Sequence, residues 1–385
     1  MPRRRLPVVQ PSSLPPLYAA WMDELLAAPL PQETEATCDD CVMLPGPGEP
    51  VGGDSFDPST KCCTYLPELA NFLVGRVLVD RDPAAKHGRE TVEQRIDAKI
   101  AVTPLWIAPP APYRAVYEIA TTNLEWGRVR SLRCPHYLEG QGFNCGIWKS
   151  RNSVCATWFC KHVRGAVGMG LWLEGIQPLL ANVERALSLW CVLELGCDDE
   201  TLRGLRPPSR PAHVPDIEHG AELRTDPVRY ARLWGRWLGK EREFYAKCAN
   251  LVDRLAWKDV LAIGGVELRA RARVAKELFQ VHTSPKVPHR LRVGPFEIAA
   301  MGEQGARVST YSKYDALELP TVLVSLLARF DGRPTTEVTR EIARTEGVDV
   351  DDGLLRKLVD FGILVASDTE RPPRSTSASS RPLGG

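Results

Sequence analysis

Cysteine is the residue type in this sequence that is concentrated enough to do chemistry. Eight of the 11 cysteines lie between Cys38 and Cys160. In a reducing compartment, clustered cysteines bind metals or carry out redox chemistry more often than they form structural disulfides. We therefore predict a metal centre whose ligands are drawn from Cys38, Cys41, Cys62, Cys63, Cys134, Cys145, Cys155 and Cys160.

The spacing of these cysteines separates them into two groups. Cys38 and Cys41 form a Cys-x-x-Cys pair, which lets two thiolates converge on one metal and also suits a redox dithiol. The adjacent Cys62 and Cys63 complete the first group, and we expect one of them to bind while the other packs or serves a second centre. The second group holds Cys134, Cys145, Cys155 and Cys160, with ten, nine and four residues between successive members.

Ligand type and spacing favour iron–sulfur over zinc. Structural zinc sites usually take two close ligands from each of two turns, and this sequence has a single Cys-x-x-Cys. Thiolates scattered along the chain suit an iron–sulfur cluster, so we expect one or two 4Fe-4S clusters, with zinc as the alternative. His136 and His162 lie near the cysteines as substitute ligands, although a hydrogen-bonded loop histidine is the simpler interpretation of each.

Other sequence features carry less chemistry. The chain has no Cys-x3-Cys-x2-Cys triplet, and Gly165–Gly170 does not follow an apolar strand, so we interpret it as a turn or helix start. Cys191 and Cys248 occupy apolar helix faces and are predicted core residues, whereas Cys197 is expected at a helix end. Arg151 and Lys161 lie beside cysteines, where their charge would offset that of metal-bound thiolates or would simply be solvated.

Composition and charge limit the class of protein. The 385 residues suffice for two or three domains, and 44% hydrophobic with 25% charged residues is typical of a globular protein. The net charge of +1 gives no global field toward nucleic acid or an anionic membrane. The N-terminal residues lack the apolar core of a signal peptide, and no apolar run is long enough to span a bilayer. We therefore expect a cytoplasmic protein without a membrane or nucleic-acid partner.

Hydrophobic periodicity predicts an α+β, mainly α chain. Residues 113–122 have a strand-like mix, and residues 131–163 are expected to be irregular. Helical spacing continues over residues 16–28, 176–195, 230–255 and 266–279, with a Pro- and Arg-rich linker at 203–215. Toward the C-terminus we predict strands at 296–301 and 307–312 and then helices at 320–330, 335–345 and 351–359.

These elements predict a sequence of domains along the chain. An N-terminal arm and short helix (1–30) precede an irregular cysteine-cluster domain that binds metal (31–165). A helical domain (166–285), a small winged-helix-like domain (290–368) and a low-complexity, disordered tail (369–385) follow.

The run CPHYLEGQGFNCGIWKSRNSVCATWFC resembles the YkgJ-type cysteine-cluster proteins, which are described as zinc- or iron-chelating. The matching positions are Cys134, the step Cys145-Gly146-Ile147-Trp148, Arg151 and Cys155, with the upstream Cys-x-x-Cys and double cysteine in the leading half. Asn152 replaces the family's proline and Cys160 is additional. The resemblance covers residues 36–163. A related group, the flagellin lysine N-methylases, implies an iron–sulfur cluster and S-adenosylmethionine-dependent methyl transfer.

The C-terminal region resembles the small winged-helix domains of the PqqD type, which bind leader peptides. The resemblance rests on apolar positions such as Leu326-Leu327 and Ile363-Leu364 and on the turn Asp331-Gly332. A DNA-binding winged helix is disfavoured, because residues 315–365 hold ten acidic and six basic residues. The resemblance implies that this domain holds a peptide or protein substrate, while packing on the helical domain is the plainer role.

Two hypotheses follow. In the first, the chain is an iron–sulfur protein that modifies a peptide or protein substrate, with S-adenosylmethionine-dependent methylation as the concrete reaction. In the second, zinc holds the cysteine-rich loops together and the chain is a non-enzymatic interaction module.

Overall fold

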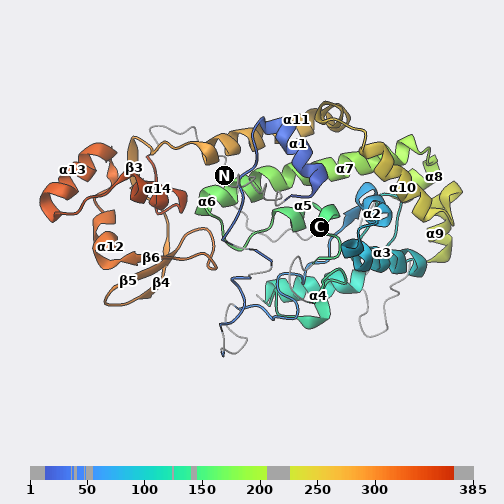
Figure 1. Cartoon of the computed structure of the whole chain (residues 1–385), viewed down its shortest axis with the longest axis horizontal. Coiled ribbons are helices and arrows are strands. Elements are labelled where there is room, and N and C mark those ends of the chain that lie inside the picture. The colour runs from blue at the N-terminus through green and yellow to red at the C-terminus, as the bar shows by residue number, and fades with distance from the viewer. Residues whose placement is uncertain are drawn as a thin grey trace, which may run out of the picture. The chain divides into compact units, whose positions relative to one another are not determined.

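The structure is a computed structural model of the chain, and it describes residues 14–35, 37–38, 41–46, 48, 55–123, 125–139, 145–205 and 226–367. These residues form mainly helices with small antiparallel sheets, which confirms the predicted mainly α composition of an α+β chain (Figure 1). In this part of the chain, no helix combines the length and apolarity needed to cross a membrane. The predicted tail at 369–385 lies outside the described residues, as does the linker from residue 206 onward.

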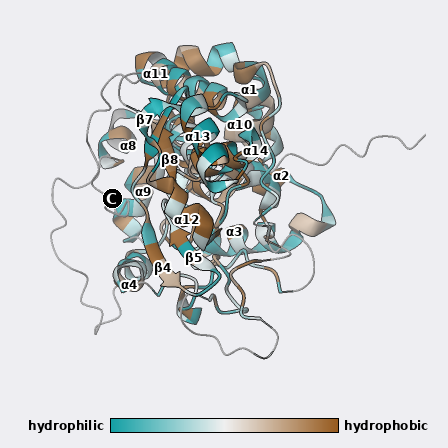
Figure 2. Ribbon diagram, turned by 90° about the vertical axis from the view of Figure 1, so that its left-hand side faces the viewer, coloured by the Kyte–Doolittle hydropathy of each residue, from teal (hydrophilic) through white to brown (hydrophobic). Residues whose placement is uncertain are grey.

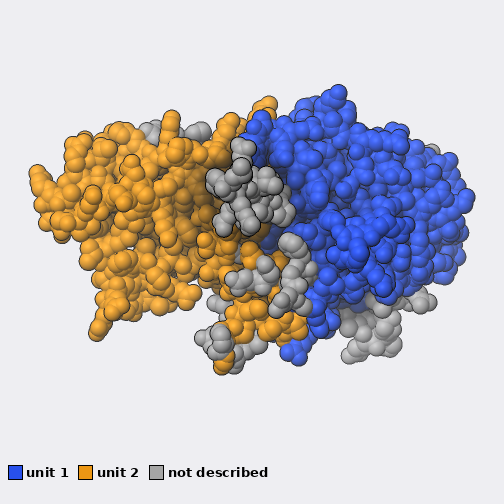
Figure 3. Space-filling model, viewed as in Figure 1, with its two compact units in different colours: residues 1–32, 62–158, 177–272 blue, residues 33–61, 159–176, 273–385 orange. Residues whose placement is uncertain are grey.

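The chain divides into two compact units, each assembled from three separate segments (Figure 3). The first unit holds residues 1–32, 62–158 and 177–272, and the second holds residues 33–61, 159–176 and 273–385. The predicted cysteine-cluster domain, 31–165, is therefore shared between the two units. The reason is that the polypeptide passes from one unit to the other at residues 33, 62, 159, 177 and 273, whereas sequence composition favours consecutive domains.

The first unit is helical. Its only sheet in the described residues pairs two short antiparallel strands, β1 (Leu69–Ala70) and β2 (Trp106–Ile107). Its α-helices are α1 (Pro16–Leu26), α2 (Asn71–Val79), α3 (Lys86–Ala98), α4 (Ala111–Thr122), α5 (Ser153–Thr157), α7 (Gln177–Glu194), α8 (Asp199–Gly204), α9 (Pro227–Trp234), α10 (Glu241–Val252) and α11 (Trp257–Thr283) up to Ala272. Short 3-10 helices are η1 (Pro83–Ala85), η2 (Arg130–Leu132), η3 (Trp148–Ser150) and η6 (Gly235–Trp237).

Close packing of α2 against α10 forms the centre of this unit. Seven of the nine residues of α2 are buried, so the helix has almost no solvent-facing side. Gly75 makes the approach between the two helices possible, because a Cβ at this position would lie 1.9 Å from the carbonyl oxygen of Tyr245. Trp234, Phe244 and Tyr245 are buried in the same core and pack edge-on against one another. Trp234 is fully buried, whereas Trp237 is half-buried.

The prediction of a strand at 113–122 is wrong, because these residues lie in helix α4. Tyr, Val and Thr favour a strand, but Pro112 in the first helical turn fixes φ at a helical value. Tyr113 and Tyr117 then stack four residues apart, with ring centroids 6.2 Å apart and planes 12° from parallel. Local β propensity is therefore overruled by the helix start and by this stacked pair.

The predicted helices at 16–28 and 176–195 are confirmed as α1 and α7, but the helix predicted over 230–255 is interrupted. It is divided into α9 and α10 at Gly235 and Gly239, whose φ values of 45° and 78° lie in the left-handed region. The helix predicted at 266–279 is confirmed within α11, which has a kink at Gly265 with φ of 64°. Glycine adopts this conformation without the steric cost that other residues incur.

The second unit combines the C-terminal half of α11 with small helices and two antiparallel sheets. The sheet orders are β7–β3–β8 and β4–β5–β6. The strands are β3 (Arg290–Val293), β4 (Glu297–Met301), β5 (Gly305–Ser309), β6 (Leu317–Pro320), β7 (Asp331–Pro334) and β8 (Leu364–Ala366). The helices are α6 (Gly165–Met169), the π-helix η4 (Gly170–Ile176), α12 (Thr321–Leu327), α13 (Thr335–Glu346) and α14 (Asp352–Asp360).

The strands and helices predicted beyond residue 295 are confirmed in position by β4, β5, α12, α13 and α14. Their apolar residues form one core that includes Leu291, Phe330, Ile342 and Leu358. Helix α12 contributes a strongly apolar sequence to this part of the chain (Figure 2). Along the chain the order is β4, β5, β6, α12, β7, α13, α14 and β8, and the winged-helix-like domain type stays a prediction.

Candidate metal centre

Five of the eight predicted ligands gather in the first unit. Cys62 and Cys63 lie in a turn-rich segment, Cys134 follows η2, Cys145 precedes η3, and Cys155 lies in α5. The backbone N–H of Cys134 donates to the carbonyl oxygen of Cys63 at 2.8 Å, which joins the two parts of the chain directly. The five cysteines thus combine half of the first sequence group with three members of the second group.

The thiols of these five cysteines influence one another electrostatically. The pKa of Cys62 is raised by its hydrogen bond with Cys63 and by burial, and the pKa of Cys134 is raised to about 12 by burial and by Cys145. Burial, and then the charges of Cys134 and Cys145, raise the pKa of Cys155. An ionised thiolate disfavours ionisation of its neighbours. A bound metal cation would relieve this repulsion, because it stabilises several thiolates together.

Backbone geometry around Cys134 is also favourable for a thiolate. The backbone N–H of His136 hydrogen-bonds the sulfur of Cys134 and lowers its pKa, against the effect of burial. Hydrogen bonds of this kind to cysteine sulfur help to set the properties of thiolate-bound metal centres. The isolated bridge between Tyr137 and Cys145 and the hydrogen bond from Gly146 N–H to His136 C=O, at 2.8 Å, hold the two cysteine segments together.

Arg151 supplies a positive charge beside the thiols. Its guanidinium lies 3.5 Å from the centroid of the Trp148 ring and donates to the carbonyl oxygen of Cys155 at 3.0 Å. Its charge lowers the pKa of Cys62 and of Cys155, although the hydrogen bond with Cys63 outweighs it at Cys62 and burial outweighs it at Cys155. The position of this residue agrees with the predicted role of offsetting thiolate charge. Asn152 accepts the N–H of Cys155 at 3.0 Å and caps α5.

The two histidines differ. His136 is buried and its Nδ1 lies 2.7 Å from the hydroxyl of Thr91, as expected for a hydrogen-bonded histidine, and burial lowers its pKa to about 3. His162 lies in the second unit and is also buried, but neither ring nitrogen has a hydrogen-bond partner in the described part of the chain. The interpretation of His162 as a satisfied loop histidine is therefore wrong, because Phe159 and Tyr311 surround its ring with aromatic faces.

The other three predicted ligands, Cys38, Cys41 and Cys160, belong to the second unit. Lys61 donates its ammonium to the carbonyl oxygen of Cys38, and Leu44 N–H donates to that of Cys41, so the Cys-x-x-Cys pair lies in a hydrogen-bonded loop. Their role as ligands stays a prediction.

The cysteines predicted to be inert behave as core residues. Cys191 on α7 and Cys248 on α10 are fully buried, and the Cys191 thiol approaches the carbonyl oxygen of Cys248 at 3.9 Å. Cys197 follows Gly196, whose φ of 61° ends the α7 region, as predicted for a helix end. These three residues are matched controls for any test of the five gathered cysteines.

The chemistry of the donor set fits a thiolate-bound metal. Five cysteine sulfurs lie together, with the guanidinium of Arg151 and backbone N–H groups beside them. Within the described ranges, however, no three side chains of Cys, His, Asp or Glu already form a group that could hold an ion. Adding a metal would therefore require the thiols to rotate toward a common point, which is consistent with metal binding coupled to local folding.

Three tyrosines beside the cysteines were not predicted from the sequence. Tyr65, Tyr113 and Tyr117 have raised pKa values, caused first by burial and then by the nearby thiols of Cys155 and Cys134. Tyr113 donates its hydroxyl to the carbonyl oxygen of Thr64 at 2.5 Å, next to the double cysteine. The four-residue spacing of two of these tyrosines signals a helix, but the strand-like composition concealed it.

No protein-family model matches the sequence, and neither a curated protein nor a solved structure matches it. The resemblance to the cysteine-cluster proteins therefore rests on the motif residues themselves.

Proposed function

We propose that the chain is a cysteine-cluster metalloprotein that binds iron–sulfur in preference to zinc and acts on a peptide or protein substrate. The observation that carries the proposal is the gathering of Cys62, Cys63, Cys134, Cys145 and Cys155 from separate parts of the sequence. Their raised pKa values show that several of these thiols do not ionise readily together, and a bound cation would stabilise them as thiolates. Cys38, Cys41 and Cys160 remain candidate ligands of the same or a second centre.

Ligand type supports iron–sulfur within this proposal. All gathered donors are thiols, and His136 is already engaged with Thr91. Thiolate-only sets hold either zinc or iron–sulfur clusters, and the wide spacing of these cysteines along the chain favours the cluster, which would supply electron transfer or Lewis-acid chemistry when bound. Arg151 would offset part of the negative charge of the complex, and the backbone N–H of His136 would stabilise the sulfur of Cys134.

A peptide or protein substrate is the proposed partner of the C-terminal domain. Support comes from the resemblance of its apolar pattern to leader-peptide-binding winged helices, and the sheet β4–β5–β6 is followed there by α12, β7, α13, α14 and β8. The acidic balance of this region disfavours nucleic acid as a ligand. Methyl transfer from S-adenosylmethionine is the concrete reaction proposed from the motif resemblance, and cytoplasmic localisation stays the expectation drawn from the sequence.

Metal and sulfide analysis of anaerobically purified protein tests this function. We expect a brown protein with iron and acid-labile sulfide. The variants Cys134→Ser and Cys155→Ser should lose colour and iron, whereas Cys191→Ser, which lies in the core of the same unit, should keep both. Colourless protein that carries neither iron nor sulfide after anaerobic reconstitution would exclude the iron–sulfur form. Methyl-labelled S-adenosylmethionine, added with candidate protein substrates, then tests the reaction.

The alternative is a zinc-stapled interaction module without catalysis. The irregular backbone around the cysteines favours it, because Cys62, Cys63 and Cys134 lie outside α-helices and strands. A structural zinc would supply the stability that such segments lack. Stoichiometric zinc without iron, together with unfolding of the first unit in Cys134→Ser, would support this alternative.

A further inference from the structure

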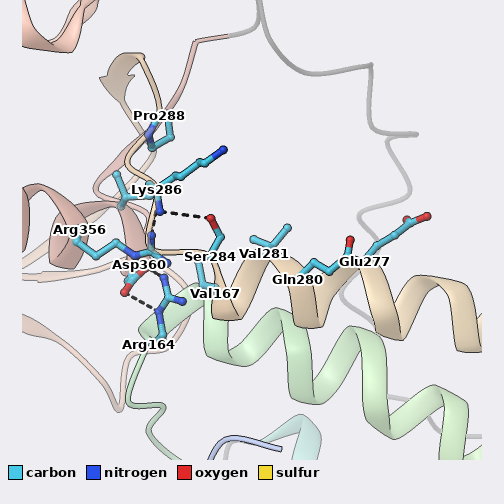
Figure 4. Close-up of a pocket in the computed structure, with 11 residues that line it drawn as sticks. Arg164, Val167, Glu277, Gln280, Val281, Ser284, Lys286, Pro288, Arg356 and Asp360 are labelled. Atoms are coloured by element: carbon cyan, nitrogen blue, oxygen red, sulfur yellow. Dashed lines mark hydrogen bonds and ion pairs between the residues drawn. The ribbon is translucent and has the colours of Figure 1, made fainter. Parts of the chain in front are cut away.

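A pocket of about 450 Å³ lies wholly within the second unit (Figure 4). Its walls come from α6, the C-terminal half of α11, the segment that follows α11, and α14. It shares no residue with the cysteine cluster. Clefts of a few hundred Å³ are the usual size of small-ligand sites.

Two arginines meet at one carboxylate in this pocket. Arg164 donates from Nε at 2.8 Å and from Nη2 at 2.5 Å to Asp360, and Arg356 donates from Nε to the same carboxylate at 2.9 Å. All three side chains are at most one-fifth exposed. Asp360 therefore fixes both guanidinium groups side by side, as Figure 4 shows.

The arginine pair retains unused hydrogen-bond donors. Arg164 Nη1 and Arg356 Nη2 have no hydrogen-bond partner among the described residues, while Arg356 Nη1 donates to the carbonyl oxygen of Lys286 at 2.9 Å. The ammonium of Lys286 forms no ion pair in that part of the chain. A guanidinium held in place by a buried carboxylate is already ordered, so it loses little entropy when it binds an anion.

The charges of the pocket do not cancel. Three basic side chains (Arg164, Lys286, Arg356) line it against two acidic ones (Asp360 and Glu277). Figure 4 shows the carboxylate of Glu277 pointing away from the arginine pair. An excess of one positive charge in a partly enclosed place favours a ligand with a single negative charge.

His282 lies close enough to the arginine pair for its pKa to respond to the charge of Arg164. It is buried beside this pair, and its Nε2 has no hydrogen-bond partner in the described ranges. Burial first and the charge of Arg164 second lower its pKa to about 4, against the opposing effect of Asp360. His282 is therefore neutral near pH 7 and leaves the balance of charge unchanged.

Most of the remaining lining is apolar, with Gln280 and Ser284 as its uncharged polar members. Val167, Val281, Val359 and Pro288 line the pocket. Val281 is 55% exposed, although it sits on a helix face next to the arginine pair. A ligand that joins one anionic group to a short apolar body would satisfy both kinds of wall at once.

We propose that this pocket binds a carboxylate attached to a short, branched apolar body, held by Arg164, Arg356 and Lys286 and packed against Val281. The carboxylate comes either from a free small acid or from the C-terminus of a peptide that ends in an apolar residue. This site goes beyond the proposed function, and binding here does not depend on a metal.

Calorimetry with the full chain tests the proposal, using 4-methylpentanoate and its neutral amide as probes. We expect the acid to bind about tenfold or more tightly than the amide, because only the acid carries the charge. Lys286→Gln should weaken acid binding about fivefold or more, since it removes an exposed ammonium without disturbing the core. The matched control is Arg344→Gln, an exposed charge on α13 outside the pocket, which should leave binding unchanged.

Further probes separate the sources of the carboxylate. A short peptide ending in leucine is compared with the same peptide carrying a C-terminal amide. Preference for the peptide acid identifies a peptide terminus, and binding of the free acid alone identifies a small metabolite. Equal binding of acid and amide, unchanged binding in Lys286→Gln, or tighter binding of inorganic phosphate than of 4-methylpentanoate would each overturn the proposal.

Discussion

The hydroxyl of Tyr18 donates a 2.5 Å hydrogen bond to the carboxylate of Glu184 in the first unit. The same carboxyl group accepts the backbone N–H of Ser153 at 2.5 Å and its hydroxyl at 3.0 Å. Glu184 therefore joins α1 and α7 to the start of α5, the helix that carries Cys155. The residue as a whole is partly exposed, yet burial of its carboxyl group raises the pKa to about 7, against the lowering effect of these hydrogen bonds.

The raised pKa of Glu184 predicts a pH-dependent stability. In the unfolded chain this carboxyl ionises near pH 4, so between about pH 4 and pH 7 the folded state holds a proton that the unfolded state releases. Its contribution to stability is complete below that range and is lost as the pH rises through 7. The shift corresponds to about 3 kcal/mol, which partial solvent exposure reduces to about 1–2 kcal/mol.

Glu184→Gln should remove this dependence. Relative to the natural chain, the variant should gain about 1–2 kcal/mol between pH 4.5 and pH 7.5, measured by urea unfolding. Glu194→Gln, an exposed position on the same helix, is the control and should show no such change. A parallel pH profile for Glu184→Gln and the natural chain would contradict the assignment.

The contact between α2 and α10 predicts the effect of a single methyl group. In Gly75→Ala, the new Cβ would meet the backbone of Tyr245 at 1.9 Å and Ala249 at 2.9 Å, so the two helices must separate. The backbone cannot move aside as a flexible side chain can, so we expect the free energy of unfolding to fall by about 3 kcal/mol or more. Gly170→Ala has open space around its Cβ and should be neutral. Thermal unfolding of both variants gives the comparison.

Glu33 is a buried acceptor in the second unit. It accepts the indole N–H of Trp172 at 2.7 Å and the backbone N–H of Val163 at 2.6 Å. Glu33→Ala leaves both donors without this acceptor, and we expect a loss of about 2–5 kcal/mol in the free energy of unfolding. Glu35→Ala, two residues away and exposed, should cost little. Similar denaturation midpoints for the two variants would show that water replaces the carboxylate.

Local pattern predicted α1, α7, α12, α13, α14, part of α11 and the β4–β5 pair, because each has periodic apolar residues and clear breakers, but it did not predict α2, α3 or α4. It did not predict β3, β7 or β8. These strands are three or four residues long, and β3 pairs Leu291 with Ala366 and Arg290 with Pro334. Their stability comes from partners far along the sequence, which no local window contains. The kinks at Gly235 and Gly265 were missed because a single glycine also occurs inside continuous helices.

The sequence predicted what kind of site the chain holds better than it predicted which residues come together there. Cysteine count and spacing indicated a metal centre, but only tertiary structure brings Cys62 and Cys63 to Cys134. Glu184 gave no signal, because one acidic residue in an amphipathic helix is usually a solvated position. Its importance depends on Tyr18, which lies 166 positions away.

Arg151 predicts how charge beside the thiols affects metal retention. Its guanidinium is held against Trp148 and lowers the pKa of both Cys62 and Cys155, so a bound thiolate complex would gain from its charge. We expect Arg151→Gln to weaken metal binding about tenfold or more, the usual effect of losing a partner that supports the ligands. Arg151→Lys keeps the charge but loses the planar stacking, so its affinity for the metal should lie between those of the natural chain and Arg151→Gln. Metal content after dialysis against graded chelator measures the order of affinity among these variants.

Lys149→Gln, whose side chain pairs with Asp82 at 2.6 Å on the surface, is the control for lost charge alone. Equal metal loss in Lys149→Gln and Arg151→Gln would mean that general charge, not this contact, governs retention.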